Sequence, residues 1–158
     1  MDVLAAARAL HVLAVVIWIG GVSMVTMVVL PAIRRGDFGP DRLSAFKVVE
    51  HRFVWIARAA VFVVGATGFY MVANRVLWQR FRMIEFWWMH AMVCLWLLFA
   101  FILFVAEPLA LHKRFKLWAG REPQRAFAWL HRAHWILLVL SLLTIFGAVV
   151  GSQGSPIF

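Results

Sequence analysis

The sequence predicts an all-α integral membrane protein: a four-helix bundle that crosses a lipid bilayer, with both chain termini outside. Two observations predict this class. First, 65% of the 158 residues are hydrophobic and only 15% are charged, whereas soluble domains are about 45–50% apolar and about 25% charged. Second, the apolar residues form four long runs, and a spanning helix needs about 20 residues. A soluble domain this small has too much surface for its volume to bury so many apolar side chains.

The four runs form a single transmembrane domain and end at charged residues or prolines. They cover roughly residues 4–30, 53–73, 86–106 and 133–151. Pro31 is predicted to stop the first helix, because proline lacks a backbone donor and clashes with the preceding turn. For the same reason Glu107-Pro108 should kink or end the third. The second and fourth helices are predicted to begin before their apolar runs, after an N-cap at Asp41 and near Pro123.

Basic residues indicate the orientation of the bundle. The first and third loops together carry eleven lysines and arginines, against four on the opposite side. Cytoplasmic loops carry this excess in membrane proteins. Both termini are therefore predicted to be periplasmic, in a multi-pass protein of a bacterial cytoplasmic (inner) membrane. The formal net charge of +9 arises from these loops, and no nucleic-acid-binding motif occurs, so lipid rather than nucleic acid is the predicted partner.

Two histidines define the main candidate site. His11 lies near the outer end of the first span and His90 near the outer end of the third, so both can lie at one level. Imidazoles on two facing helices supply the axial ligands of a b-type haem. Trp18 follows His11 by two turns on the same face and is predicted to contact the cofactor. The alternative is a pair of interfacial histidines bonded to water, lipid or carbonyls, and His112 in the third loop is predicted to be solvated.

A second cluster is expected at the inner side. His51, Trp55 and Arg58 recur at helical spacing and share one face. Arg58 is buried within the span and needs a partner, for which Glu50, a lipid phosphate and a haem propionate are candidates. His51 with His134 is a candidate site for a second haem or a metal. Snorkelling of Arg58 to the interface is the alternative interpretation.

Methionines and glycines add two weaker signals. Thioether and imidazole ligands together suit Cu(I), so Met92 with His11 and His90 is a copper alternative, although scattered methionines more often serve packing. Glycine pairs open a stripe on the first and second spans, which admits either a bulky group or a close-packed helix. The pairs are Gly20 with Gly21 and Gly65 with Gly68.

Several short motifs are similar to one known family. They are Ala9-Leu10-His11, Trp18-Ile19-Gly20-Gly21, Leu30-Pro31-Ala32, Ala66-Thr67-Gly68-Phe69-Tyr70-Met71 and Trp87-Trp88-Met89-His90-Ala91-Met92. Together they resemble the membrane spans of the CopD-type copper-resistance proteins over nearly the whole chain. The resemblance implies the four-span fold and a haem or metal role for His11 and His90.

A related family also resembles the chain. The motifs at Ala9-Leu10-His11, Glu50-His51-Arg52 and Trp88-Met89-His90 are similar to the HemJ-type protoporphyrinogen oxidase, a four-span haem b family. That family continues its third-span histidine as His-x-Lys-Leu, whereas this chain has Met92 and Val93. The missing lysine argues against the oxidase activity but leaves the histidine pair intact.

Four functions therefore follow as hypotheses. The first is a bis-histidine haem b protein with an electron-transfer role, passing electrons between a quinone or protein donor and an outer acceptor. The second is a CopD-like copper transport or resistance protein. The third is an enzyme, a haem-dependent membrane oxidoreductase. The fourth is an accessory subunit of a larger membrane complex or a homo-oligomer.

Overall fold

A computed structural model describes residues 2–39, 41–75 and 77–152, apart from the side chains at 45, 109–113 and 116. Within these residues the chain is helical between short connections, so the predicted all-α class is confirmed. Four helices are long and apolar enough to cross a membrane, namely Val3–Arg35, Arg42–Asn74, Ile84–Pro108 and Pro123–Ser152. In chain order the elements are α1 (Val3–Met24), η1 (Val25–Val29), α2 (Leu30–Arg35), α3 (Arg42–Asn74), η2 (Leu77–Arg82), η3 (Ile84–Phe86), α4 (Trp87–Phe101), η4 (Ile102–Leu111), α5 (His112–Arg121) and α6 (Pro123–Ser152).

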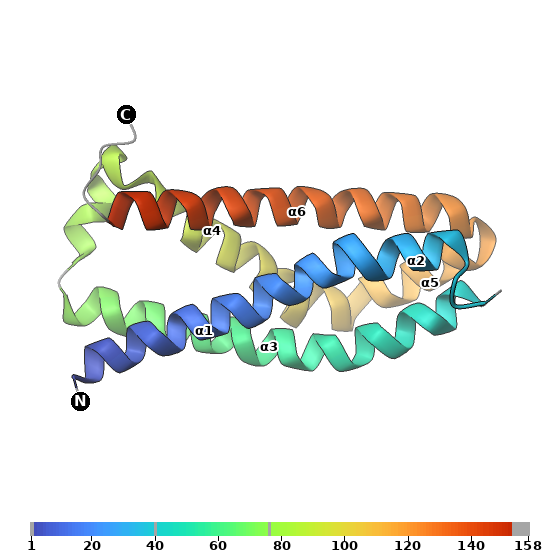
Figure 1. Cartoon of the computed structure of the whole chain (residues 1–158), viewed down its shortest axis with the longest axis horizontal. Coiled ribbons are helices and arrows are strands. Elements are labelled where there is room, and N and C mark those ends of the chain that lie inside the picture. Colours follow the sequence, from blue (N-terminus) through green and yellow to red (C-terminus); the bar gives the residue numbers. More distant parts are fainter. Residues whose placement is uncertain (1, 40, 76, 153–158) are drawn as a thin grey trace.

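The helices form an elongated bundle in which α1 packs along α3, while α4 packs against α6 (Figure 1). The start of α1 and the end of α6 lie at one end of the bundle, which we call the terminal end. The opposite end holds α2, α5 and the start of α3, and we call it the basic end. Four long helices that alternate in direction bring the start of α1 and the end of α6 to the same end.

Two apolar clusters form the core. The middle of the bundle is filled by Trp18, Val61, Phe99 and Leu138, among other buried residues. The basic end has a separate cluster around Leu30, Phe46 and Phe127. Outside these clusters large apolar side chains cover the surface: Phe62 is 70% exposed and Ile136 is 61% exposed. Such an exterior is compatible with contact to lipid, because lipid tails carry no hydrophobic penalty for these groups.

Two helices begin before their apolar runs, as predicted. Asp41 caps α3 by accepting a hydrogen bond from the backbone N–H of Ser44 at 3.0 Å. The Ser44 hydroxyl and N–H lower the pKa of Asp41, because both hydrogen bonds stabilise the carboxylate. The fourth helix begins at Pro123, where the missing N–H is harmless because the first helical turn has no acceptor for it.

The prediction that Pro31 stops the first helix is wrong. The helix continues to Arg35 and ends at Gly36, which adopts a left-handed conformation with φ 89°. The proline is accommodated by η1, a π-helical turn in which the N–H of Leu30 bonds to the Val25 carbonyl. One extra residue in this turn shifts the backbone away from the clash that the proline ring would cause in a regular α-helix.

The third helix also passes through its proline. Pro108 lies inside the π-helix η4, and the chain continues as helix into α5. Of the two outcomes predicted at Glu107-Pro108, the helix end is therefore wrong. A widened turn again provides the room that the proline ring needs.

Candidate functional site

The ring of His11 is held against α3 by a chain of hydrogen bonds. Its Nδ1 lies 3.0 Å from Thr67 Oγ1, and the Thr67 hydroxyl donates to the Val63 carbonyl at 2.6 Å. Because the hydroxyl proton is used on Val63, Nδ1 must carry the proton that is donated to Thr67. Nε2 is then the unprotonated nitrogen, and among the described residues it has no hydrogen-bond partner. A histidine in this state is ready to act as a metal ligand.

Gly68 provides the space for this arrangement. A Cβ at position 68 would lie 3.3 Å from Cε1 of His11. The Thr67-Gly68 pair thus acts as one unit, in which threonine orients the imidazole and glycine lets it approach α3. Gly68 was predicted from the sequence to open a stripe on this span, whereas Thr67 was named only as part of a motif. A threonine beside a glycine on the facing span was a usable signal.

His90 is held differently, by backbone carbonyls at the terminal end. Its Nε2 lies 3.0 Å from the Phe81 carbonyl and its Nδ1 lies 3.4 Å from the Phe86 carbonyl. A neutral imidazole has only one N–H, so the shorter contact fixes it on Nε2. For Nε2 to bind iron instead, the proton would have to move to Nδ1, where the Phe86 carbonyl is placed to accept it, and η2 would have to release the ring.

The two histidines lie at similar depth. Helices α1 and α4 touch where the ring of Trp18 meets Phe99 edge-on, with centroids 4.8 Å apart. His11 and His90 precede these residues by seven and nine positions, which corresponds to about 10 and 13 Å along the helix axes. The levels thus agree to within about one helical turn. The Trp18 indole N–H is buried and has no partner among the described residues, so it is free to donate to a bound group.

The glycine stripes are occupied mainly by aromatic side chains of the protein itself. A Cβ at Gly21 would collide with the ring of Phe53, and one at Gly65 would collide with Trp96. The Trp96 indole donates to the Val61 carbonyl at 2.8 Å, which ties α4 to α3. Only Gly20 faces open space among these four. Close helix packing, the second of the two interpretations, therefore accounts for Gly21 and Gly65.

Arg58 has a partner that sequence analysis did not consider. Its Nη2 forms an ion pair with Glu107 Oε2 at 2.7 Å, and both side chains are largely buried. Its Nε and Nη2 also donate to the Leu103 carbonyl at 3.0 and 2.9 Å. The guanidinium lies over the Trp55 ring, 5.0 Å from the centroid. Arg58 is thus neutralised within the protein, and a haem propionate or lipid phosphate would have to compete with Glu107.

The Leu103 carbonyl needs this side-chain donor because of Pro108. In the i+5 pattern of a π-helix the donor for the Leu103 carbonyl would be residue 108, and proline has no N–H. A carbonyl without a donor is costly inside a membrane. Arg58 therefore repairs a gap in the backbone hydrogen bonding that the proline creates.

The same repair occurs in the first span, where Pro31 is five residues after Thr26. The N–H of Leu30 is used on Val25, so the Thr26 carbonyl has no backbone donor. It lies 2.9 Å from Nε2 of His131 on α6. The other ring nitrogen lies 2.9 Å from Nη1 of Arg34, which can only donate, and this contact favours a proton on Nε2 that is donated to the Thr26 carbonyl. The Trp135 indole N–H also points at Nε2, at 3.0 Å, and competes for this nitrogen. His131 thus offers a side-chain donor to a carbonyl that Pro31 leaves without one, as Arg58 does for the carbonyl affected by Pro108.

His131 was not singled out from the sequence, and its role leads to a prediction. Replacing it with phenylalanine leaves the Thr26 carbonyl unpaired and is expected to lower the free energy of unfolding by about 1–3 kcal/mol. Pro31→Ala supplies the missing backbone N–H and should recover most of this loss. The measurement is thermal unfolding in detergent, with His51→Phe as a control at an exposed position. Equal losses with and without Pro31 would contradict the assigned role.

The inner cluster is only partly assembled. His51 lines a cavity of about 350 Å³ together with Lys47, Arg58 and Glu107. His134, the other member of the candidate second site, bonds through Nδ1 to the Leu130 carbonyl of its own helix at 2.9 Å. No described contact joins the two rings. Within the described part of the chain, no group of three or more His, Cys, Asp or Glu residues is arranged to hold a metal ion.

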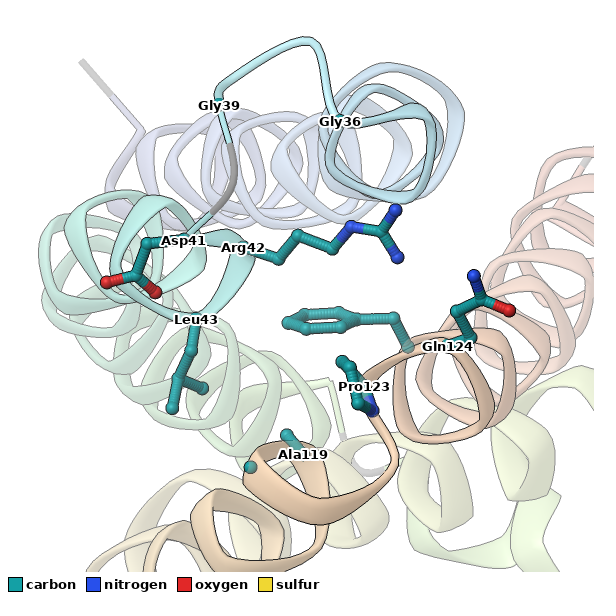
Figure 2. A pocket seen from close by; sticks show the side chains of 10 residues that line it. Gly36, Gly39, Asp41, Arg42, Leu43, Ala119, Pro123 and Gln124 are labelled. Carbon is teal, nitrogen blue, oxygen red and sulfur yellow. The ribbon is translucent and has the colours of Figure 1, made fainter.

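Two further features stand apart from the histidine pair. A cavity of about 730 Å³ lies at the basic end, between the α2–α3 connection, the start of α3 and the α5–α6 turn. Figure 2 shows the side chain of Arg42 extending across it from the start of α3, with Pro123 and Gln124 on the facing helix. None of the predicted ligands lines this cavity.

Met92, the copper alternative, is partly buried on α4, while its neighbour Met89 is buried in the protein.

The fold and the candidate site define a class of protein: a helical bundle with four candidate membrane spans, two histidines at similar depth and two proline-distorted helices braced by ionisable side chains. No family model, curated protein or solved structure matches the chain. The CopD-like and HemJ-like resemblance therefore stays a prediction from the sequence, and function must be argued from the residues themselves.

Proposed function

We propose that this protein is a multi-pass b-type haem protein of a bacterial cytoplasmic membrane, with His11 and His90 as axial ligands and a role in electron transfer. The observation that carries the proposal is the chain from His11 through Thr67 to Val63. This chain of hydrogen bonds fixes the orientation of the imidazole and leaves the unprotonated Nε2 as the nitrogen that would bind the iron. Histidines that bind metals are oriented in this way by a partner for the other ring nitrogen.

Two residues give the rest of the support. The similar depth of His90 makes it the candidate for the second residue that would hold the haem. Trp18 offers a buried N–H that has no partner among the residues the structure describes. A bound haem would supply a one-electron iron couple, while the residues of the chain would hold and orient it. His90 is the residue whose hydrogen bonds must change, since Phe81 holds its Nε2 in this structure.

The orientation follows from the basic end. The loops at that end carry most of the lysines and arginines, and such loops are retained in the cytoplasm. The terminal end, with His11 and His90, then lies near the periplasmic surface. From there the site would exchange electrons with a periplasmic acceptor, while a quinone or a redox protein is the candidate donor.

The test is the absorption spectrum of the purified protein together with its metal content. A Soret band, an α band on reduction and stoichiometric iron are expected. Stoichiometric copper without iron, lost in Met92→Leu, would replace the proposal with the copper-handling alternative. Neither haem nor metal would leave the accessory-subunit alternative, and complementation of a strain that lacks protoporphyrinogen oxidation would reveal the enzyme.

Thr67 gives a specific prediction for the haem site. Thr67→Val keeps the shape of the side chain but removes the acceptor for Nδ1–H of His11. We expect haem affinity to fall by about 10–100-fold, as measured by haem titration of the apoprotein. Thr144→Val is the matched control, because the Thr144 hydroxyl also bonds four residues back, to Leu140, and touches no histidine. Equal affinities of the two variants would contradict the role of Thr67.

A further inference from the structure

The helical hairpin at the basic end contains one sequence pattern twice. In each copy an arginine is followed by a tryptophan after four residues and by a second arginine after three more. The copies are Arg114, Trp118, Arg121 and Arg125, Trp129, Arg132. Residues at this spacing share one face of a helix. Each of α5 and α6 therefore carries one stripe, and we call the six residues together the Arg/Trp patch.

The structure brings the two stripes together on the surface. The rings of Trp118 and Trp129 are in edge contact, with centroids 6.1 Å apart, and all six residues of the patch are exposed. The hairpin turns at Glu122, between α5 and α6. Arg121 and Arg125 thus flank the turn, while Arg114 and Arg132 lie at the other end of the patch, towards the membrane-spanning segment.

Packing on the opposite face keeps the patch turned outward. Phe115 on α5 contacts Phe127 on α6, with ring centroids 5.8 Å apart, and both rings also meet Phe46 of α3. Ala119 is buried on the same side of α5. These contacts fix the rotation of both helices, so the arginines and tryptophans face away from the bundle.

The charge of the patch is largely uncompensated. Glu122 bonds to Arg125 at 3.0 Å, and both side chains are well exposed. Within the described part of the chain, no other ion pair involves the four arginines of the patch. Guanidinium groups bind phosphate oxygens through two parallel hydrogen bonds. The patch therefore has an excess of groups suited to phosphate.

The position of the patch along α6 matches the headgroup layer. The 30 residues of α6 span about 45 Å, whereas the hydrocarbon core is about 30 Å thick. The apolar run begins at Ala133, so the ten residues from Pro123 to Arg132 extend about 15 Å beyond it. Tryptophan is enriched at this level of a membrane.

We propose that the Arg/Trp patch binds anionic phospholipids, with the arginines on the headgroup phosphates and the two indoles beside the glycerol region. The inference is independent of the haem proposal, because it rests on other residues at the opposite end of the bundle. It specifies a lipid rather than a free anion, because the tryptophans and the depth along α6 suit a molecule that is anchored in the bilayer.

The experiment uses the full-length protein in neutral detergent. Phosphatidylglycerol is titrated and its apparent dissociation constant is taken from the rise in the thermal unfolding midpoint. Phosphatidylcholine and inorganic phosphate are titrated in parallel. Arg114→Gln/Arg132→Gln is compared with Arg42→Gln/Arg52→Gln, a pair at the same end of the bundle with the same change in net charge.

We expect the patch variant to bind phosphatidylglycerol about 30-fold more weakly, from the usual contribution of two basic residues near an anionic membrane. The control pair should change the constant by less than about threefold. Equal weakening in the two variants would show general charge attraction and overturn the proposal. It is also overturned if phosphatidylcholine binds as well as phosphatidylglycerol, or if inorganic phosphate alone gives the full effect. The first result would leave any phosphate-bearing lipid as the partner, and the second would leave a free anion.

Discussion

Replacing Arg58 with methionine is expected to lower the free energy of unfolding by about 3–5 kcal/mol, the usual cost of removing one partner of a buried ion pair. The variant leaves two groups unpaired at once, the Glu107 carboxylate and the Leu103 carbonyl. Both belong to the third span, and the Glu107 side chain is only 27% exposed, so water would replace the guanidinium poorly. The measurement is the unfolding midpoint in detergent, by heat or by titration with a denaturing detergent.

The structure also provides a rescue for this variant. Glu107→Gln removes the charge, and Pro108→Ala restores a backbone N–H for the Leu103 carbonyl. In the Glu107→Gln/Pro108→Ala background, Arg58→Met should therefore lower the free energy of unfolding by less than half of the loss that it causes in the unmodified protein. Arg52→Met, an exposed arginine on the same helix, is the control and should change little. The assigned role of Arg58 would be refuted if Arg58→Met and Arg52→Met lowered the free energy of unfolding equally. It would also be refuted if the double background gave no rescue.

Loss of the Soret band is the expected result for His11→Ala, and the same is expected for His90→Ala. Each removes one of the two strong ligands that a low-spin b-type haem requires. His112→Ala, in the basic third loop, should keep the spectrum. Because a helix variant can also fail to fold, each protein is checked by far-UV circular dichroism and size-exclusion chromatography. A folded His11→Ala protein with an unchanged spectrum would refute the ligand assignment.

The two ligands should differ in how they respond to their surroundings. His11 is already oriented by Thr67, whereas His90 must give up the Phe81 carbonyl. Phe81 meets His90 through its carbonyl and also through its ring, which lies edge-on with centroids 5.5 Å apart. Because a Phe81→Leu variant keeps the carbonyl, it should affect binding less than Thr67→Val. The comparison distinguishes His11, which is oriented before haem binds, from His90, which must change its hydrogen bonds when haem binds.

The sequence predicted the class of fold because the signals for it are local. Runs of apolar residues, the Asp41 cap and the placement of Pro123 each depend on neighbours within a few positions, and the structure confirms the four candidate spans and the early helix starts. The two prolines were the exception. Proline is a strong local signal for a helix end, but a π-helical turn and a side chain from another helix overcame it at both Pro31 and Pro108.

The partners of the polar residues were beyond sequence reasoning. Arg58 was recognised as a group in need of a partner, yet Glu107 lies 49 positions away. His131 reaches across 105 positions to Thr26, and nothing in its own neighbourhood marks it. The glycine stripes allowed two interpretations, and only the positions of Phe53 and Trp96 decided between them.

By itself, the sequence determined that this chain is a helical bundle with four apolar spans and a basic end, and it singled out His11, His90 and Arg58 as residues that need an explanation. Only the tertiary structure decided which groups satisfy them. The physical reason is that apolar helices can pack in many ways, since one apolar face resembles another. A carbonyl that has lost its backbone donor needs another donor within hydrogen-bond distance. Whether a side chain lies at that distance depends on how all the helices pack together.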